Sequence, residues 1–331
     1  MRLVALAAIA VVLIVIIAAI VVNCSKPASS TASQSAAAAN ATASSAAAEI
    51  AASVESAEAA DASETSAETP AAEANTASAQ IPVVDAEPGD VSYTVAQAAK
   101  LKYRDADFAV NPARTDWNYD TPNGHKTIYL TLDDGPSANT ERVLDILDQY
   151  NCKATFFVTG QNPDYFPWIK EAYDRGHTIG LHSYSHDYES CYSSTERFWN
   201  EFDEIGQVVK DQIGYVPCFI RFPGGASNTI SADYSQGIMT ELANQAHERG
   251  YQYYDWSLSC GDGSVHTADE LVYYGCEPTD EENVIYLAHD GSAKETTAEA
   301  LPAIIEYYQS QGYTFEAIDR STMVFQHDIA N

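Results

Sequence analysis

Short apolar runs alternate with amphipathic segments along the chain from residue 124 onward. Strands are expected where β-branched and aromatic residues cluster, at residues 127–133, 154–160, 177–181, 219–222, 251–256, 283–289 and 313–318. Between these runs apolar side chains recur at helical spacing, as Val143 and Leu147 do. This spacing predicts helices at residues 140–150, 163–175, 194–213, 238–249 and 301–308.

Repeated strand–helix units predict an α/β domain with a mostly parallel sheet that helices cover. About seven such units in roughly two hundred residues favour a distorted (β/α) barrel, either closed or incomplete. In barrels of this kind the chemistry lies at the C-terminal ends of the strands. Polar side chains should therefore gather just after the strand runs.

The N-terminal segment has a different pattern. Residues 3–22 are apolar without interruption, and at about 1.5 Å per residue they span a hydrocarbon core of roughly 30 Å. Arg2 precedes them, and a positive flank stays inside, so the rest of the chain should be extracytoplasmic. The length of this apolar run favours an uncleaved transmembrane anchor that comprises residues 1–23. The alternative is a cleaved signal with a lipid on Cys24, although Asn23 fits that motif poorly.

Residues 24–90 are rich in Ala, Ser, Thr and Glu and have few large apolar side chains. Such a segment cannot bury enough apolar surface to offset its ordering entropy, so we expect a disordered linker. Aromatic residues return in residues 91–123, which we expect to be a lead-in that packs on the folded domain. The domain itself is expected at residues 124–320, followed by a tail at residues 321–331.

Composition narrows the possible partners. The formal net charge is −30, of which residues 91–331 carry −22. This charge repels phosphate backbones and excludes nucleic acid as a natural partner, whereas a neutral sugar polymer remains compatible. Six cysteines are present without a C-x-x-C pair, so a thiolate zinc site has little support. Cys260 and Cys276 are close in sequence and are the expected pair if a disulfide forms, which an exported domain permits; the alternative is two free thiols.

Polar residues do follow the strand runs. Asp133 and Asp134 stand in a D-D-G-P turn, and a bound cation would relieve the repulsion between their carboxylates. His182 and His186, four residues apart, are either unrelated surface histidines or two ligands of one metal. With Asp134 they make three ligands and leave an open position, which is typical of catalytic rather than structural zinc.

Two further strand ends carry candidate chemistry. His289 ends the run at 283–289, and taken alone it is a structural histidine. With Asp255 hydrogen-bonded to it, His289 is a candidate general acid. Arg221 follows an apolar run and should pair with a carboxylate.

Five segments in this order resemble the polysaccharide deacetylase family, which is carbohydrate esterase family 4 or the NodB homology domain. They are TLDDGP (131–136), HSYSH (182–186), RFPGG (221–225), YDW (254–256) and LAH (287–289). The resemblance covers roughly residues 124–318 and points in particular to the peptidoglycan N-acetylglucosamine deacetylases of Gram-positive bacteria. It implies a distorted (β/α) barrel, usually of seven strands.

The resemblance also implies roles for single residues. Asp133 would be the catalytic base and His289 the catalytic acid. A divalent metal, commonly zinc and alternatively cobalt, would be held by Asp134, His182 and His186.

The remaining implied roles concern orientation and substrate binding. Arg221 would orient the base and Asp255 would tune the acid. Leu287 would line the pocket for the acetyl methyl group, and Trp256 would form part of the groove wall. Gly224 stands where many members have an aromatic residue, although its N–H can still serve an oxyanion hole. Asp262 lies further along the chain than the family pattern usually places that acidic residue.

The sequence thus predicts a metal-dependent hydrolase that removes N-acetyl groups from a cell-surface polysaccharide, with peptidoglycan N-acetylglucosamine as the expected substrate. We expect the catalytic domain to be monomeric. Deacetylation of chitin or acetylxylan is one alternative. A non-catalytic carbohydrate-binding wall module is a second alternative. It is disfavoured because every predicted catalytic position carries a chemically competent residue.

Overall fold

The computed structural model describes residues 107–331. The predicted anchor at residues 3–22, the predicted linker and Cys24 lie outside the described residues, as does the beginning of the predicted lead-in. Within residues 107–331, none of the helices combines the length and the apolar character that a membrane span requires.

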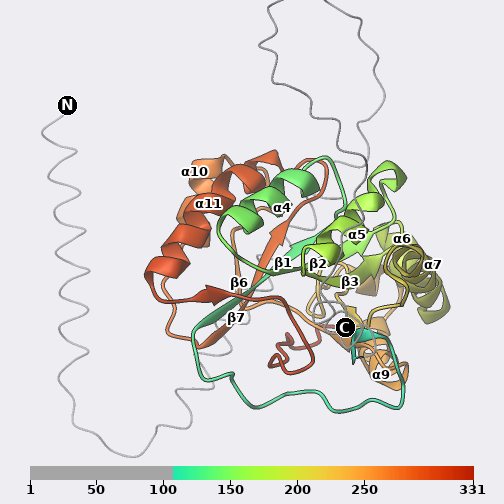
Figure 1. Ribbon diagram of the computed structural model, residues 1–331. Helices are drawn as coiled ribbons and strands as arrows, with labels where there is room; N and C mark the ends of the chain where they lie inside the picture. The colour runs from blue at the N-terminus through green and yellow to red at the C-terminus, as the bar shows by residue number, and fades with distance from the viewer. Residues whose placement is uncertain (1–106) are drawn as a thin grey trace, which may run out of the picture. The chain divides into compact units, whose positions relative to one another are not determined.

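The fold is built on one parallel sheet (Figure 1). Its strand order is β5-β4-β3-β2-β1-β7-β6, and the short β8 pairs with the beginning of β1. The bounds are β1 Thr127–Asp133, β2 Ala154–Thr159, β3 Thr178–Ser183, β4 Phe219–Ile220, β5 Gln252–Tyr253, β6 Leu258–Ser259, β7 Asn283–His289 and β8 Thr314–Phe315. Among the described strands no pairing joins β5 to β6, so the barrel is open there. The predicted α/β fold, an incomplete barrel of about seven parallel strands, is confirmed.

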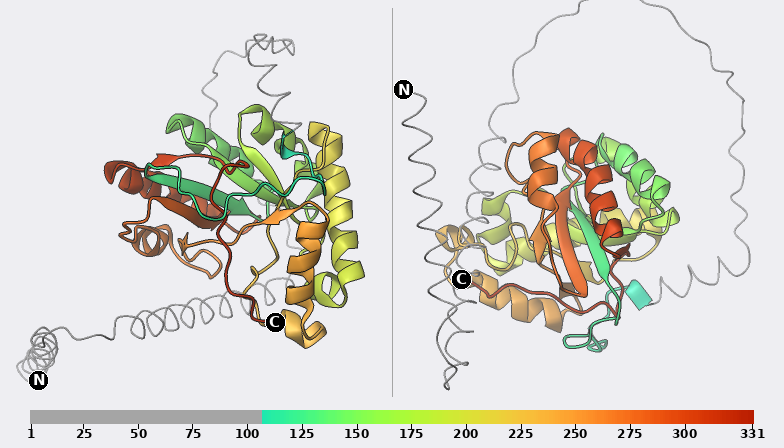
Figure 2. Two further views of the ribbon diagram at one scale, coloured as in Figure 1. Left: turned by 90° about the horizontal axis from the view of Figure 1, so that it is seen from below. Right: turned by 90° about the vertical axis from the view of Figure 1, so that its left-hand side faces the viewer.

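Helices cover the outside of the sheet (Figures 1 and 2). The longer ones are α4 Thr140–Gln149, α5 Pro167–Asp174, α7 Thr195–Ile213, α9 Ile238–Glu248, α10 Ala268–Gly275 and α11 Glu295–Ser310. The shorter ones are η1 Pro163–Tyr165, α6 Tyr188–Tyr192 and α8 Ser231–Tyr234. Helix α10 packs beside α11 and α11 beside α4, whereas α7 packs against α5 and α9.

Most of the longer helices follow the predicted ranges because their apolar stripes decide which face is buried. In α7 the buried side chains include Phe198, Phe202 and Ile205. The single helix predicted at residues 163–175 is instead η1 followed by α5. Pro167 begins α5, since a proline fits the first helical position, where its missing N–H costs no hydrogen bond.

Strand alternation divides the core into two layers. The side chains of Ile128 and Leu130 point to the helices, while Tyr129 and Ile285 point into the barrel. The inner layer is completed by Phe108, from the segment before the barrel, and by residues near the C-terminus. The same alternation places the last residues of β1 and β7 on the inner face.

The two segments that flank the barrel contact each other and the strands. The ring of Trp117 lies edge-on to Phe219, with 6.1 Å between centroids, and the guanidinium of Arg320 covers it at 3.8 Å. Further along, the backbone O of Phe325 accepts a hydrogen bond from the N–H of Asp255 at 2.9 Å. The chain then ends beside α9, where the O of Asn331 accepts from a backbone N–H at the start of that helix (Figure 2).

The structure corrects one covalent prediction. Cys260 and Cys276 are both free thiols, so the predicted disulfide between them is wrong. Cys260 is fully buried at the end of β6, and Cys276 is partly exposed after α10. Their spacing of sixteen residues left both outcomes open, because a bridge depends on the direction of the two Cβ atoms.

Candidate active site

The site begins with the register of β1 and β7, which are the two longest strands of the sheet. Asp133 ends β1, His289 ends β7, and the two residues stand opposite each other in the parallel ladder. Both are buried. The predicted base and the predicted acid therefore lie side by side at the C-terminal edge of the sheet, where the fold class places its chemistry.

Three predicted metal ligands converge at the same edge. Asp134, His182 and His186 each offer one ligand atom, and these atoms lie within 4.8 Å of one another. The Nε2 atoms of His182 and His186 are 3.6 Å and 3.4 Å from Oδ1 of Asp134. One carboxylate and two imidazoles are a ligand set that suits zinc and leaves room for further ligands.

The donor atoms fit a cation. Oδ1 of Asp134 is buried and has no hydrogen-bond partner, a costly state that a bound cation would relieve. Nδ1 of His182 donates to the backbone O of Arg221 at 2.9 Å, which leaves the lone pair of Nε2 facing Asp134. Burial, together with the charge of His186, lowers the pKa of His182 to about 3, so its imidazole is in the neutral form that binds metals.

Local backbone conformations aim these ligands. Asp134 and His186 both have positive φ, at 68° and 53°, a region that non-glycine residues occupy at a cost of about 1–3 kcal/mol and mostly at functional sites. The loop between the histidines is held by Glu201 of α7. Its carboxylate accepts hydrogen bonds from the N–H groups of Tyr184 and Ser185, at 3.1 Å and 2.6 Å.

We call Asp133, Arg221 and Thr131 the base half of the site. Arg221 is fully buried and donates to Oδ1 of Asp133 at 2.9 Å and to Oγ1 of Thr131 at 2.6 Å. It is anchored by the backbone O atoms of Tyr254 and Asp255, at 2.8 Å and 3.0 Å. Burial raises the pKa of Asp133 to about 6, against the opposing charge of Arg221. This carboxylate is thus ionised at neutral pH and is a better proton acceptor than an exposed one.

The acid half consists of His289, Asp262 and Thr297. Nδ1 of His289 lies 2.9 Å from Oδ1 of Asp262, and the backbone N–H of His289 donates to Oδ2 at 2.8 Å. The hydroxyl of Thr297 donates to Oδ2 as well, at 2.8 Å. Burial alone would lower the pKa of His289, but the charge and hydrogen bond of Asp262 outweigh it and raise the pKa to about 10. His289 therefore carries a proton at neutral pH.

The predicted hydrogen bond between Asp255 and His289 is wrong, because Asp262 occupies that place. The carboxylate of Asp255 instead accepts backbone N–H groups, from Ala226 at 2.9 Å and from His327 at 2.8 Å. Asp255 thus holds two loops against β5, and it meets the base half only through its backbone O. The partner of the acid comes from the loop after β6, seven residues further along the chain.

Of the three predicted substrate-binding residues, Leu287 and Trp256 lie beside the base half. Leu287 is two residues before the end of β7, on the inner face, where it stands in register with Thr131 and Ser259. The ring of Trp256 is 5.7 Å from the guanidinium of Arg221. Gly224 has a φ of 73°, which a glycine adopts without strain.

Several residues that build the site had little or no signal in the sequence. Asp262 was visible only as an acidic residue further along than the family pattern places it. Glu201 stands on the polar side of a helix and Thr131 inside a strand, where neither has a distinguishing neighbour. Asp290 is buried beneath the turn after β1 and accepts from the hydroxyl of Thr140 at 2.6 Å, and burial raises its pKa to about 7.

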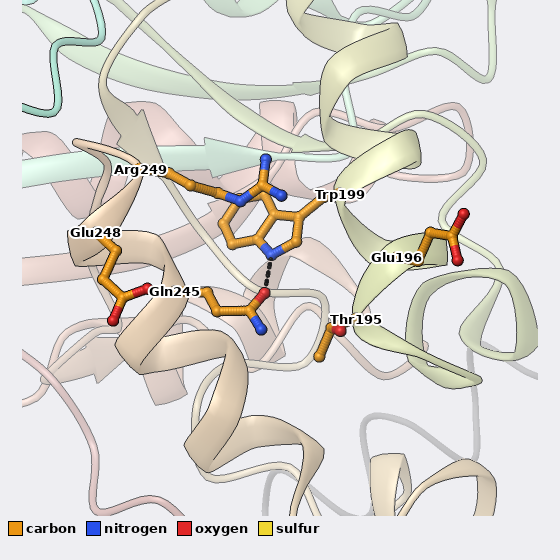
Figure 3. A pocket seen from close by; sticks show the side chains of 6 residues that line it. All are labelled: Thr195, Glu196, Trp199, Gln245, Glu248 and Arg249. Atoms are coloured by element: carbon orange, nitrogen blue, oxygen red, sulfur yellow. Dashed lines mark hydrogen bonds between the residues drawn. The ribbon is translucent and has the colours of Figure 1, made fainter.

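A surface hollow of about 370 Å³ lies elsewhere, between α7 and α9 (Figure 3). Its largest lining side chain, Trp199, is only 2% exposed. Arg249 covers the indole ring at 4.5 Å, and Gln245 accepts the indole N–H at 2.6 Å. The indole has no free face for a ligand, so this hollow is no rival to the strand-end site.

Comparison with known proteins identifies the family of the chain. The sequence profile described as polysaccharide deacetylase matches residues 120–242, which include Asp133, Asp134, both HSYSH histidines and Arg221. The Bacillus subtilis protein YheN, whose name places it among polysaccharide deacetylases, is 30% identical over 240 residues, which cover 70% of this chain and 79% of that protein.

Peptidoglycan-N-acetylglucosamine deacetylase of Bacillus cereus is 30% identical over 217 residues, which cover 61% of this chain and 74% of the relative. Among solved structures, the catalytic domain of peptidoglycan N-acetylglucosamine deacetylase from Eubacterium rectale is similar, with 40% identity and a TM-score of 0.62. That match covers 67% of this chain and all of the other. The chain is therefore an enzyme of the polysaccharide deacetylase family, carbohydrate esterase family 4.

Proposed function

We propose that this enzyme hydrolyses the N-acetyl groups of peptidoglycan N-acetylglucosamine outside the cell, with a divalent metal as cofactor. One observation carries the proposal. A cluster of metal-ligand type, a carboxylate acceptor and a protonated imidazole stand together at the ends of β1, β3 and β7. Hydrolysis of an amide needs these three functions, because the carbonyl must be polarised, water must lose a proton and the amine must gain one.

Asp134, His182 and His186 would hold the metal, for which zinc is the first candidate and cobalt the second. When bound, such an ion polarises the amide carbonyl and lowers the pKa of water. The orphaned Oδ1 of Asp134 and the neutral imidazole of His182 support this assignment.

Asp133 would act as the base. Its Oδ1 is engaged by Arg221, which fixes the orientation of the carboxylate. Its Oδ2 lies 3.9 Å from Nε2 of His182 and so faces the ligand cluster. Oδ2 would take one proton from a water molecule while the water oxygen forms a bond with the carbonyl carbon.

His289 would act as the acid. Nδ1 is engaged by Asp262, so Nε2 is the nitrogen that can give its proton to the leaving amine when the carbon–nitrogen bond breaks. The products are acetate and an amino sugar. Gly224 would donate its backbone N–H to the developing oxyanion, Leu287 would contact the acetyl methyl group, and Trp256 would border the sugar.

The choice of peptidoglycan rests on two observations. The relatives from Bacillus cereus and Eubacterium rectale are named for peptidoglycan N-acetylglucosamine. In addition, the apolar segment at residues 3–22 and the linker at residues 24–90 would tether a monomeric domain near the wall of its own cell. A cleaved or lipid-modified N-terminus at Cys24 remains the alternative form of export.

Acetate release from a substrate panel tests the proposal. The enzyme is incubated with purified cell wall, N-acetylglucosamine oligomers and acetylxylan, after chelation and after addition of zinc or cobalt. We expect release from wall and oligomers that is lost on chelation and restored by metal. Preferred release from acetylxylan would overturn the substrate, unchanged release after verified metal removal would overturn the cofactor, and sugar binding without any release would indicate a binding module.

A further inference from the structure

An exposed aromatic patch lies close to the acid half of the site. Six large apolar side chains are exposed in residues 107–331, and three of them fall within ten positions of one another. They are Val265, which is 99% exposed, Tyr273 at 79% and Tyr274 at 47%. Single exposed apolar residues are ordinary, whereas grouped ones mark candidate contact surfaces, so this grouping is a candidate binding surface.

The patch is continuous in space. The ring of His266 lies 5.2 Å from that of Tyr274, and Tyr274 lies 5.4 Å from Tyr273. Val265 precedes His266 in the chain. We call these four residues, Val265, His266, Tyr273 and Tyr274, the Tyr273 patch.

The loop between β6 and α10 connects the patch to the site. Asp262, the hydrogen-bond partner of His289, is only 2% exposed, whereas Val265, three residues later, is almost fully exposed. At about 3.6 Å per residue, the two Cα atoms are at most about 11 Å apart. At the other end of the patch, a Cβ placed on Gly261 would lie 3.8 Å from Tyr274. The patch therefore borders the segment that positions His289.

The charges around the patch limit what can bind there. Residues 260–293 contain eight acidic residues and no lysine or arginine, and the next residue, Lys294, donates from Nζ to the backbone O of Asp262 at 2.7 Å. A polyanion would be repelled, and a second copy of this chain would bring the same acidic surface. A neutral sugar is not repelled, and tyrosine suits it because the ring offers an apolar face while the hydroxyl stays in water.

We infer that the Tyr273 patch is a binding subsite for the sugar polymer, engaging units of the chain beyond the one whose acetyl group is removed. This inference rests on the proposed function, because it assumes that a polymer lies across the strand ends. The patch would lower the KM for long substrates and leave the chemical step on short ones unchanged.

The test compares short and long soluble substrates in the full-length enzyme loaded with zinc. Acetate release is measured from the dimer and the hexamer of N-acetylglucosamine for the wild type, for Tyr273→Ala and for Tyr273→Ala combined with Tyr274→Ala. We expect kcat/KM on the hexamer to fall about three- to tenfold in the double variant, the size expected for one or two aromatic contacts, with the dimer unchanged. Tyr273→Phe should keep most of the hexamer activity, because the ring face remains.

A matched control is Tyr119→Ala, since Tyr119 is 47% exposed but lies before β1, and its hydroxyl contacts Gln252 at the beginning of β5. This variant should leave the hexamer-to-dimer ratio unchanged. An unchanged ratio in the double variant, with an active wild type, overturns the subsite and leaves the proposed function standing. A change of oligomeric state on size-exclusion chromatography without a change of ratio would make the patch a contact between copies. A wild type that releases no acetate from purified cell wall or from either oligomer overturns both proposals.

Discussion

The base half and the acid half of the site are neighbours across one strand pair, yet they hold opposite charges at the same pH. Asp133 is a buried carboxylate whose partner, Arg221, is anchored by backbone oxygens. His289 is a buried imidazole whose partner is the carboxylate of Asp262. Each reacting group has its own counter-charge, so the acceptor stays deprotonated and the donor stays protonated between about pH 6 and pH 10.

Two buried groups of unlike ordinary pKa are thus held in different charge states side by side. Burial moves both toward their neutral forms, because it raises the pKa of a carboxylic acid and lowers that of an imidazole. The charged partner of each group therefore decides whether that group is protonated at neutral pH. The charge of Arg221 limits the rise for Asp133, whereas that of Asp262 reverses the fall for His289. Changing one partner at a time therefore separates the two halves.

The largest effect is expected from the base half. Asp133→Asn keeps the size of the side chain but removes the proton acceptor, so the rate of acetate release should fall by about 10²–10⁴. The metal ligands are untouched, and the metal content measured by elemental analysis should equal that of the wild type. Near-normal turnover in this variant would show that Asp133 is not the base.

The acid half is expected to respond through its pH dependence. In Asp262→Asn the carboxylate charge is lost, and the pKa of His289 should fall from about 10 to its ordinary value of about 6.5 or lower. At pH 8 the protonated fraction, and with it the rate, should then drop about 30-fold. The alkaline limb of kcat/KM is the measurement. A limb that stays near pH 10 would mean that Asp262 does not set the proton affinity of the acid.

The acidic limb of the wild type reports the base half. The pKa of Asp133 is about 6, and the active form is the ionised one, so activity is lost as pH falls through this value. Between pH 7 and pH 5, kcat/KM should decrease about tenfold. Metal content at pH 5 must be measured in parallel, because the histidine ligands also bind protons. A flat profile down to pH 5 with metal retained would contradict the raised pKa.

The smallest kinetic effect is expected from Asp255→Asn, the residue that the sequence paired with His289. Its carboxylate holds the N–H groups of Ala226 and His327, so the variant should lose about 1–3 kcal/mol of unfolding free energy. The alkaline limb should stay near pH 10, and the rate at pH 8 should change less than about threefold. Urea unfolding and a pH profile measure the two quantities. A shift of the limb as large as in Asp262→Asn would restore Asp255 to the acid half.

Much of the fold could be predicted because its signals are local. β1 and β7 are long apolar runs, and α7 carries an apolar stripe over several turns. The missed elements are short. β6 has two residues, and α10 has eight and begins with a capping box between Thr267 and Glu270. Elements of this length contain too few periods to stand out, and their neighbours in space decide their conformation.

By itself, the sequence determined which groups reach the strand ends, since the alternation within a strand decides which side chains face the barrel. Asp133, His182, Arg221 and His289 follow from that rule. Asp134 lies just past the end of β1, and its positive φ of 68° in the turn aims its carboxylate. Which side chains form hydrogen bonds with one another depends on the tertiary structure. Asp255 follows β5 and Asp262 follows β6, and both carboxylates are buried. Cys260 follows β6 directly and Cys276 follows α10, and both are free thiols. Which of them meets a partner depends on the path of a loop in three dimensions, and no short-range pattern encodes that path.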